Sequence, residues 1–496
     1  MDSHKYHVTE GEVAGLREPI DAQVVKKIKE MQVIGVRSVA EVRRHLEKFV
    51  NGHLFNSKDL PAESSRRYYP TDVDIRNILN ATRSGKQRSP DDQLNLETKL
   101  SEWHELHPED FIFYRVMYHC LPCANKTCHI NSSSLFLFVY QAKWMKRLLL
   151  LYGQEMCLMD ATYRTCRYAL PLFFLCVRSN VGYIVVAVFI PENEDTGSIS
   201  EVLRILSREI QWNPRNMMVD FSLAEISAIE VFSETHVHVC DFHREKAWGE
   251  WLSKSSNGVS MYKDEVLRHL RNIAQSENQA TLDENIQALK KSRPWKESVQ
   301  LQNYFFRLLG FILRVMNKWV RFFRDEHLRI AIYTNNGIER QNNWLKHSYL
   351  ESRRNNSVSD LVDVIINHFL PDSYKKYKEQ NIRCTSSYRG YDDRVPKYLH
   401  DRPRGVVQHI ISRIDSGIQI SNIKKETPKL FIVQGAECAY QVRLGSDEEL
   451  PSCQCLDFRT KKLLCKHICA VVQQPDIGWE SLGRKFDKYP CLLWIK

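Results

Sequence analysis

Residues 155–191 read EMCLMDATYRTCRYALPLFFLCVRSNVGYIVVAVFIP and decide the fold. Three apolar runs in this stretch are rich in β-branched and aromatic residues, and they occupy 155–162, 168–177 and 183–191. Turn-forming residues separate the runs, which predicts three strands paired as an antiparallel meander. Arg178 and Gly182 interrupt the most apolar part of the chain, so buried strands suit it better than a membrane span. We therefore expect no transmembrane helix.

The pattern then alternates between helix and strand. Helix-like SISEVLRILSREI and LAEISAIEVF are each followed by a strand-like run, NMMVD and HVHVC. The resulting order β-β-β-α-β-α-β matches a ribonuclease-H-like core. From Arg244 to about Leu370 the sequence is mainly helical, which predicts an inserted helical region that returns to the sheet. The expected fold class is α/β, with this core and insertion, an N-terminal helical domain and a small C-terminal zinc-binding module.

The flanking segments complete the predicted organisation. Helical periodicity from about Ala22 to Arg83, with capping-box spacing at Ser38 and at Thr71, predicts a small helical domain. Two strand-like runs, KLFIVQG and AYQVRLG, precede a cysteine-rich segment. The expected domains are a helical DNA-binding domain (1–90), a linker with helices (91–154), the core with its insertion (155–375), a connector (376–430), a zinc finger (431–476) and a tail (477–496).

Composition limits the function without deciding it. The chain has 496 residues, of which 43% are hydrophobic, and its 70 Lys and Arg exceed 60 Asp and Glu by ten charges. This balance permits a polyanionic partner such as DNA. Because the N-terminal MDSHKYHVTE has no apolar core after a basic start, we expect no secretory signal, and a DNA partner would place the protein in the nucleus. The 14 cysteines are then expected to stay reduced and, where clustered, to bind metal.

The segment SCQCLDFRTKKLLCKHICAVV contains C-x-C, nine residues, and C-x-H. Residues two apart in a strand point to the same side, so Cys453 and Cys455 can offer both thiolates to one ion, while Cys465 and His467 close a tetrahedron. The alternative is a group of buried thiols, and that is the interpretation we prefer for Cys469. The pattern resembles the SWIM zinc finger, which implies one structural Zn²⁺ and contacts to DNA or to protein partners.

Carboxylates close two of the predicted strands. Asp160 ends the first strand-like run and Asp220 ends NMMVD, and in a ribonuclease-H-like sheet these strand ends lie side by side. Glu339 begins a helix-like segment after the turn signal TNNG. Three carboxylates are what a two-metal Mg²⁺ or Mn²⁺ site needs. Spacing alone also permits solvated strand ends and helix caps.

Four stretches together resemble the transposases of Mutator-like elements, and they are LMDATYRTCRYALPLFFLCV, MMVDFSLAEISAIEVF, VHVCDFHREKAW and YTNNGIERQNNWLKH. The resemblance implies that Asp160, Asp220 and Glu339 are the catalytic acids of a DNA strand-cutting and strand-joining enzyme. The family also carries C-x-x-H after its second Asp, here Cys240 and His243, with either a metal-binding or a structural role.

Near the N-terminus, EVRRHLEKFV and SSRRYYPTDVDIRNIL resemble the DNA-binding region of the calcium-responsive transcription factor. The residues that would contact DNA are Arg43, Arg44, Arg66, Arg67, Tyr68 and Arg76. An ordinary solvated basic helix face would carry the same side chains. A further cluster that metal or free thiols would explain consists of Cys120, Cys123, Cys128 and His129.

Two main hypotheses of function remain at this stage. The first is an enzyme, a Mutator-like transposase that cuts and joins DNA with Mg²⁺ or Mn²⁺. The second is a domesticated, catalytically inactive nuclear factor that binds DNA or protein, which Phe221 and Ser222 favour because many relatives have an Arg-Asp-like continuation there. A weaker third hypothesis is a protein-interaction module that recruits partners through the finger. The sequence leaves the oligomeric state open.

Overall fold

The fold is seen in a computed structural model. It describes residues 18–33, 36, 38–55, 60–84, 92–116, 135–310, 316–325, 332, 334–350, 356–383, 391, 395, 397–414, 417–435 and 438–489. Cys120, Cys123, Cys128 and His129 lie outside these ranges, so the prediction for this cluster stays untested. No helix in the described part of the chain combines the length and the apolar character that crossing a bilayer requires.

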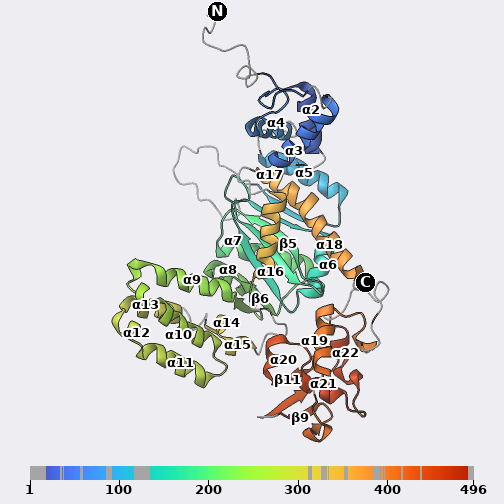
Figure 1. The fold of residues 1–496 in the computed structure, drawn as a ribbon. Coiled ribbons are helices and arrows are strands. Elements are labelled where there is room, and N and C mark those ends of the chain that lie inside the picture. The colour runs from blue at the N-terminus through green and yellow to red at the C-terminus, as the bar shows by residue number, and fades with distance from the viewer. Residues whose placement is uncertain are drawn as a thin grey trace, which may run out of the picture.

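A seven-stranded mixed sheet forms the centre of the molecule (Figure 1). Its strands are β1 (Phe111–Arg115), β2 (Leu137–Gln141), β3 (Cys157–Thr162), β4 (Leu172–Arg178), β5 (Tyr183–Pro191), β6 (Asn216–Val219) and β7 (His236–Val239). Their order is β1-β2-β5-β4-β3-β6-β7. The strands from β1 to β3 pair antiparallel, whereas β3, β6 and β7 run parallel.

Two of these strands were not anticipated. Region 91–154 was expected to hold a linker and helices, and it does contain α5 (Asp92–Leu106) and α6 (Lys143–Tyr152). It also adds β1 and β2 to the edge of the sheet beside β5. Both strands are five residues long, which leaves little room for a period-two pattern to stand out.

Alternate residues of the strands feed two cores, one on each face of the sheet. In β4, Phe173 and Leu175 face one core, and Phe174 and Cys176 face the other. The helices α7 (Thr196–Ile210) and α8 (Leu223–Ala228) cover the first face. The second face is covered by α16 (Asn336–Trp344), η6 (Leu345–Tyr349), α17 (Val358–Val364) and η7 (Ile365–Phe369).

The chain between β7 and α16 leaves the sheet as a helical insertion, which projects to one side in Figure 1. Its helices are α9 (Asp241–Ser253), α10 (Lys263–Gln275), α11 (Gln279–Lys291), α12 (Arg293–Glu297), α13 (Val299–Gly310), α14 (Met316–Trp319) and α15 (Arg321–Asp325). Buried Trp248 of α9 packs edge-on against Trp319 of α14, which ties the start of the insertion to its end. The insertion then returns the chain to the sheet at α16.

The N-terminal helices α2 (Ala22–Val33), α3 (Val39–Phe49) and α4 (Asp72–Ser84) pack around a core of their own. Ser38 caps α3, and the Thr71 hydroxyl accepts the backbone N–H of Asp74, as the capping-box spacing predicted. Next in the chain, α5 packs against α17, and the Asp92 carboxylate accepts the backbone N–H groups of Val358 and Ser359.

After α18 (Leu370–Arg383), the C-terminal part forms a small α/β unit. Its helices are α19 (Arg404–Ile414), α20 (Leu456–Lys461), α21 (Lys466–Val472) and α22 (Arg484–Asp487). Its sheet has the order β11-β10-β9-β8 and consists of β8 (Ile423–Thr427), β9 (Leu430–Gln434), β10 (Ala439–Arg443) and β11 (Ser452–Cys453). The two predicted strands are therefore the centre of a four-stranded sheet.

Candidate metal centres

The first candidate centre lies where β3 and β6 end. These strands are parallel neighbours, with Leu158 opposite Met218. Asp160 and Asp220 each lie two residues further along, so the same register brings the two acids to adjacent positions. Asp160 shares its sheet face with Leu158, which packs in the core that α16 covers. Its side chain therefore points toward α16.

Helix α16 brings the third acid to this edge of the sheet. Glu339 lies in its first turn, and α16 packs against β3, β4 and β5. The approach is close at Gly337, where a Cβ atom would come within 2.2–2.4 Å of the Tyr183 ring. Only glycine lets the helix lie this near to β5.

His243 lies between two of the acids. It extends from the first turn of α9, and its Nδ1 is 2.8 Å from Asp220 Oδ1 while its Nε2 is 3.4 Å from Glu339 Oε1. Cys240 precedes it by one helical turn and lies at the end of β7. Cys240 and His243 thus belong to the same site as the acids, which the spacing of the C-x-x-H motif did not reveal.

Two amides hold the carboxylates in place. Asn342 Nδ2 donates to Asp160 Oδ2 at 2.9 Å, and Asn335 Nδ2 donates to Asp220 Oδ1 at 2.8 Å. The backbone N–H of Asn335 donates to Cys240 Sγ at 3.2 Å. Both asparagines are buried and belong to α16 or its N-cap, so one helix supplies an acid and orients the other two. Neither asparagine was predicted as a site residue, although both lie in the TNNGIERQNN run.

The acids of the site lie close to one another, and their mutual repulsion favours a cation between them. Burial raises the pKa of Asp160 to about 8, and the negative charge of Asp220 adds to the effect. The pKa of His243 rises to about 10, first through its hydrogen bond to Asp220 and then through that to Cys240. The protein therefore favours a positive charge at this point, and a divalent cation supplies one.

The donor atoms fit metal ions of two kinds. Carboxylate oxygens such as those of Asp160, Asp220 and Glu339 are the preferred ligands of Mg²⁺ and Mn²⁺. Ligand atoms of Asp220, Cys240 and His243 lie within 4.8 Å of one another, a mixed set that a softer ion also accepts. Cys240, Asp160 and Asp220 each accept a hydrogen bond from an asparagine, but each carboxylate keeps a second oxygen for a cation.

Gly337→Ala tests the close approach of α16. The new methyl group requires a shift of the helix or of the Tyr183 ring, which is partly buried in β5. Because Glu339, Asn335 and Asn342 all move with the helix, we expect weaker Mn²⁺ binding, together with a loss of about 1–3 kcal/mol in unfolding free energy. Mn²⁺ titration and chemical denaturation measure the two effects. Unchanged values of both would show that the contact does not position α16.

The second candidate centre is the C-terminal finger. Cys453, Cys455, Cys465 and His467 are all buried, and their ligand atoms lie within 4.8 Å of one another. His467 Nδ1 is 3.7 Å from Cys453 Sγ and 4.0 Å from Cys465 Sγ. A tetrahedral Zn²⁺ with ordinary bond lengths separates such sulfur and nitrogen ligands by about 3.6 Å. The four side chains therefore fit one zinc ion with little movement.

Backbone donors favour thiolates in the finger. The N–H of Phe458 donates to Cys455 Sγ, and the N–H of Cys455 donates to Cys453 Sγ, each at 3.4 Å. Hydrogen bonds from Cys453 and then Cys465 lower the pKa of Cys455, whereas the same pairing raises the pKa of Cys453, so Cys455 is the thiolate of this pair in the metal-free finger. Cys469 lies on the next turn of α21 and is buried, and burial raises the pKa of its thiol to about 12. Cys469 thus fits the core role expected for it.

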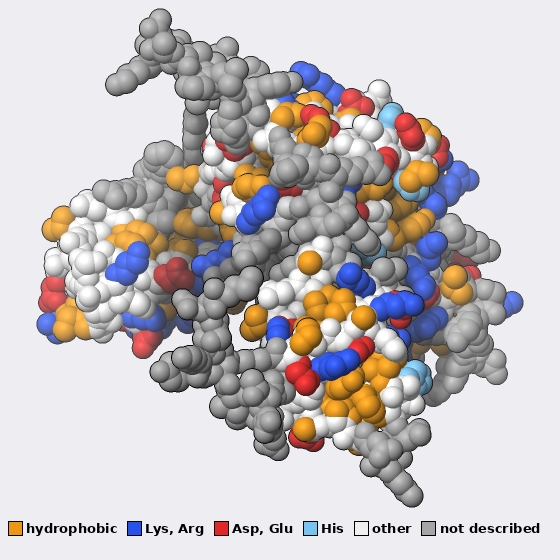
Figure 2. Space-filling model, turned by 90° about the horizontal axis from the view of Figure 1, so that it is seen from above, with side chains coloured by type: hydrophobic (Ala, Val, Ile, Leu, Met, Phe, Trp, Pro, Cys, Tyr) orange, Lys and Arg blue, Asp and Glu red, His pale blue; other side chains and the backbone are white. Residues whose placement is uncertain are grey.

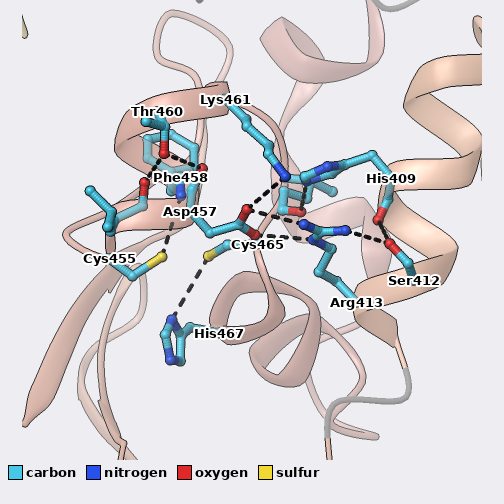
Figure 3. A network of polar contacts seen from close by, with 12 residues as sticks. His409, Ser412, Arg413, Cys455, Asp457, Phe458, Thr460, Lys461, Cys465 and His467 are labelled. Atoms are coloured by element: carbon cyan, nitrogen blue, oxygen red, sulfur yellow. Dashed lines mark hydrogen bonds and ion pairs between the residues drawn. The ribbon is translucent and has the colours of Figure 1, made fainter. Parts of the chain in front are cut away.

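Helix α19 supports the finger from the region expected to be a connector. Figure 3 shows Arg413 pointing to Asp457, and its Nε and Nη2 lie 3.0 and 3.1 Å from the two carboxylate oxygens. His409 Nε2 donates to the carbonyl of Leu464, the residue before Cys465. These contacts hold the first turn of α20, which follows Cys455, and the residue that precedes Cys465. The folded finger therefore includes α19.

The N-terminal residues predicted to contact DNA divide into two groups. Arg66 makes two hydrogen bonds to Asp74, which lower the pKa of that carboxyl to about 2, and Tyr68 packs edge-on against Phe55. Arg43 pairs with Asp72, and Arg67 lies 3.7 Å from Asp21. Arg44 and Arg76 are exposed, with no ion-pair partner among the described residues. On the face seen in Figure 2, basic side chains are interspersed with acidic and hydrophobic ones.

Comparison with known families agrees with the two centres. Residues 156–247 match the sequence model of the MULE transposase domain, and residues 440–474 match that of the SWIM zinc finger. Residues 156–247 are therefore similar to a transposase domain, and residues 440–474 are similar to a zinc finger whose four candidate ligands lie close together. Asp160, Asp220, Cys240 and His243 lie inside the first match, whereas Glu339 lies beyond it and reaches the site only through the fold.

The N-terminal region matches a third family, described as amyotrophic lateral sclerosis 2 chromosomal region candidate gene 8, over residues 1–85. The calcium-responsive transcription factor of Mus musculus is 36% identical over 73 residues. These residues are 15% of this chain and 11% of that protein, so the chain matches a small part of its relative.

Proposed function

We propose that this protein binds DNA and uses Asp160, Asp220 and Glu339, with Mg²⁺ or Mn²⁺, to cut DNA strands and join them to a target. The observation that carries the proposal is the meeting of three acids around His243, although 59 residues lie between Asp160 and Asp220 and 118 lie between Asp220 and Glu339. The first two acids come from neighbouring parallel strands, and the third returns on α16 after the insertion.

The strand order supports a ribonuclease-H-like interpretation of the core. The strands β5-β4-β3-β6-β7 form a sheet that is antiparallel on one side of β3 and parallel on the other. In such a sheet the ends of the two central parallel strands hold the first two acids. We also propose two changes to the predicted domain boundaries. The core begins at β1, because β1 and β2 belong to its sheet, and the finger begins at α19, because α19 and β8 belong to it.

The proposed chemistry divides between the cation and the chain. A bound divalent cation would stabilise the attacking and the leaving oxygen of a phosphodiester. Asp160, Asp220 and Glu339 would hold it, while Asn335 and Asn342 fix the directions of two of these carboxylates. The pKa of His243 is raised to about 10, so its ring is protonated at neutral pH in the metal-free protein. The protonated ring lies between Asp220 and Glu339.

A strand-cleavage assay tests this function. The full chain is incubated with Mg²⁺ or Mn²⁺ and with duplex DNA that carries the sequences flanking its own gene, including any terminal inverted repeats. We expect nicking at the repeat ends, and joining of the new 3′ ends to a second duplex. Binding of the same DNA without cleavage under either cation would instead favour the domesticated, inactive factor. For that factor we also propose nuclear localisation and protein contacts through the finger.

DNA binding is expected to be electrostatic and to use the exposed arginines of the N-terminal helices. Each phosphate contact by a basic side chain releases counterions, so affinity falls with salt. The plot of log affinity against log salt concentration has a negative slope. Replacing Arg44 and Arg76 by Gln should make this slope less steep by about 2. Filter binding at several salt concentrations measures the slope, and Arg293→Gln on the insertion is the matched control. An unchanged slope in the double variant would exclude these helices from the contact.

A further inference from the structure

A pocket lies between α16, α18 and the turn that joins β4 to β5. Its volume is about 560 Å³, within the range of about 300–1,000 Å³ that is typical of small-molecule sites. Arg340 of α16 lines the pocket and follows Glu339 directly in the chain. The pocket and the first centre therefore flank the same helix.

Two hydrogen bonds hold the walls of the pocket together. Gln341 Nε2 of α16 donates to the backbone carbonyl of Tyr183 at 2.8 Å, which joins α16 to β5. In the β4–β5 turn, Asn180 Nδ2 donates to Asn381 Oδ1 of α18 at 2.7 Å, and both asparagines are buried. The three walls are thus fixed relative to one another, and a preformed pocket lowers the cost of ordering the chain when a ligand binds.

The lining of the pocket is cationic, aromatic and rich in amides. Arg340 and Lys376 are exposed, and neither pairs with a carboxylate in the described part of the chain. Lys376 Nζ lies 5.3 Å from the centroid of the Trp344 ring, which holds this cation at the wall. No acid is found among the described residues of the lining, and its amides belong to Asn336, Gln341, Asn343 and Gln380.

This chemistry fits one unpaired nucleotide. Guanidinium and ammonium groups bind phosphate, and amide side chains hydrogen-bond the edges of bases. Proteins that hold single strands combine a positive groove with aromatic side chains in the same way. A duplex keeps its bases inside the stack, whereas a pocket admits a nucleotide that has been turned out of it.

The place of the pocket suits a strand that reaches the acids. One residue turns an α-helix by about 100°, so Glu339 and Arg340 leave adjacent sides of α16. A helix with its side chains is about 10–12 Å across, and stacked nucleotides of one strand follow one another about every 3.4 Å. A strand with one phosphate at the acids therefore reaches the pocket within about three or four nucleotides.

We propose that this pocket holds an unpaired nucleotide of the DNA strand that enters the first centre, with its phosphate against Arg340 and Lys376. The inference rests on the proposed function, because it specifies how the substrate of that function is held. A nucleotide fixed on one side of α16 would set the position of the strand relative to Glu339 on the other side.

Photo-crosslinking of the zinc-loaded full chain tests the inference. The probe is a single-stranded oligothymidylate in which 5-iodouracil replaces thymine, because irradiation couples this base to aromatic side chains that it contacts. Mg²⁺ and Mn²⁺ are left out, so the result does not depend on cleavage. We expect mass spectrometry to find the crosslink on Tyr183 or Trp344, which line the pocket.

The double variant Arg340→Gln, Lys376→Gln should bind this strand more weakly and lose the crosslink. Each phosphate contact on a single strand contributes about 0.7 to the slope of log affinity against log salt concentration, so the slope should become less steep by about 1.4. The matched control combines Arg204→Gln with Lys375→Gln, since both residues are exposed and lie outside the pocket. The control should bind and crosslink like the wild type.

A wild-type crosslink that maps only outside the pocket, or an unchanged slope in the double variant, would show that the strand does not enter the pocket. If thymidine 5′-monophosphate alone binds as tightly as the strand and displaces the crosslink, the pocket serves a free nucleotide and the inference is wrong. A protein that crosslinks in the pocket but never cuts DNA supports the pocket and contradicts the proposed function. A protein that cuts DNA without this crosslink contradicts only the inference.

Discussion

Cys465→Ser is expected to unfold the C-terminal finger and to remove its zinc. The free energy of zinc binding in small fingers, about 10–16 kcal/mol, is largely their folding free energy, so a lost ligand removes most of the stabilisation. The ligands are buried and lie on β11, at the start of α20 and on α21, so one ion would tie these three elements together. Zinc content by elemental analysis and limited proteolysis of the full chain measure the two effects.

The matched control for the finger is Cys438→Ser. Cys438 is exposed and lies just before β10, so its loss should change neither zinc content nor proteolysis. A strong chelator should reproduce the effect of Cys465→Ser in the wild type. A finger that holds stoichiometric zinc without Cys465, or that resists protease in the chelator, is incompatible with this ligand set.

Asp160→Asn is expected to lower strand cleavage by roughly three orders of magnitude or more, because a neutral amide is a poor cation ligand. DNA affinity should stay nearly unchanged, since phosphate contacts come from basic side chains elsewhere. The fold should tolerate the change. With a pKa of about 8, Asp160 is mostly protonated at pH 7 in the metal-free protein, and asparagine resembles that neutral form. Asn342 can still donate to its oxygen.

Cleavage and binding are measured on the same DNA, with Asp264→Asn as the control. Asp264 is an exposed acid in the first turn of α10, away from the three acids. If Asp160→Asn still cuts DNA at the wild-type rate, another residue performs the role assigned to Asp160. If it loses DNA affinity as well, the substitution has disturbed more than the metal centre.

Features that depend on local pattern could be predicted from the sequence. The apolar runs around Asp160 predicted strands, and the C-x-C and C-x-H pairs predicted the finger ligands, because short spacings fix the relative positions of side chains. The short strands β1 and β2 escaped this logic. Support of the finger by α19 also escaped, because Arg413 and His409 lie far from the ligands in sequence.

Features that depend on tertiary contacts could not be predicted in this way. The place of Glu339 was expected only through a family resemblance, since its approach depends on the insertion folding back and on Gly337 fitting against Tyr183. The position of His243 between Asp220 and Glu339 has the same origin. The contact of Arg66 with DNA stays a prediction by residue type, and its pairing with Asp74 was not predicted from the spacing.

The most direct test of the account is anomalous diffraction from crystals of the full, zinc-loaded chain soaked in Mn²⁺, recorded on both sides of the manganese absorption edge. The account predicts a manganese peak bounded by the carboxylates of Asp160, Asp220 and Glu339, and a separate zinc peak within Cys453, Cys455, Cys465 and His467. A manganese peak elsewhere, with none between the three acids, would contradict the proposed centre.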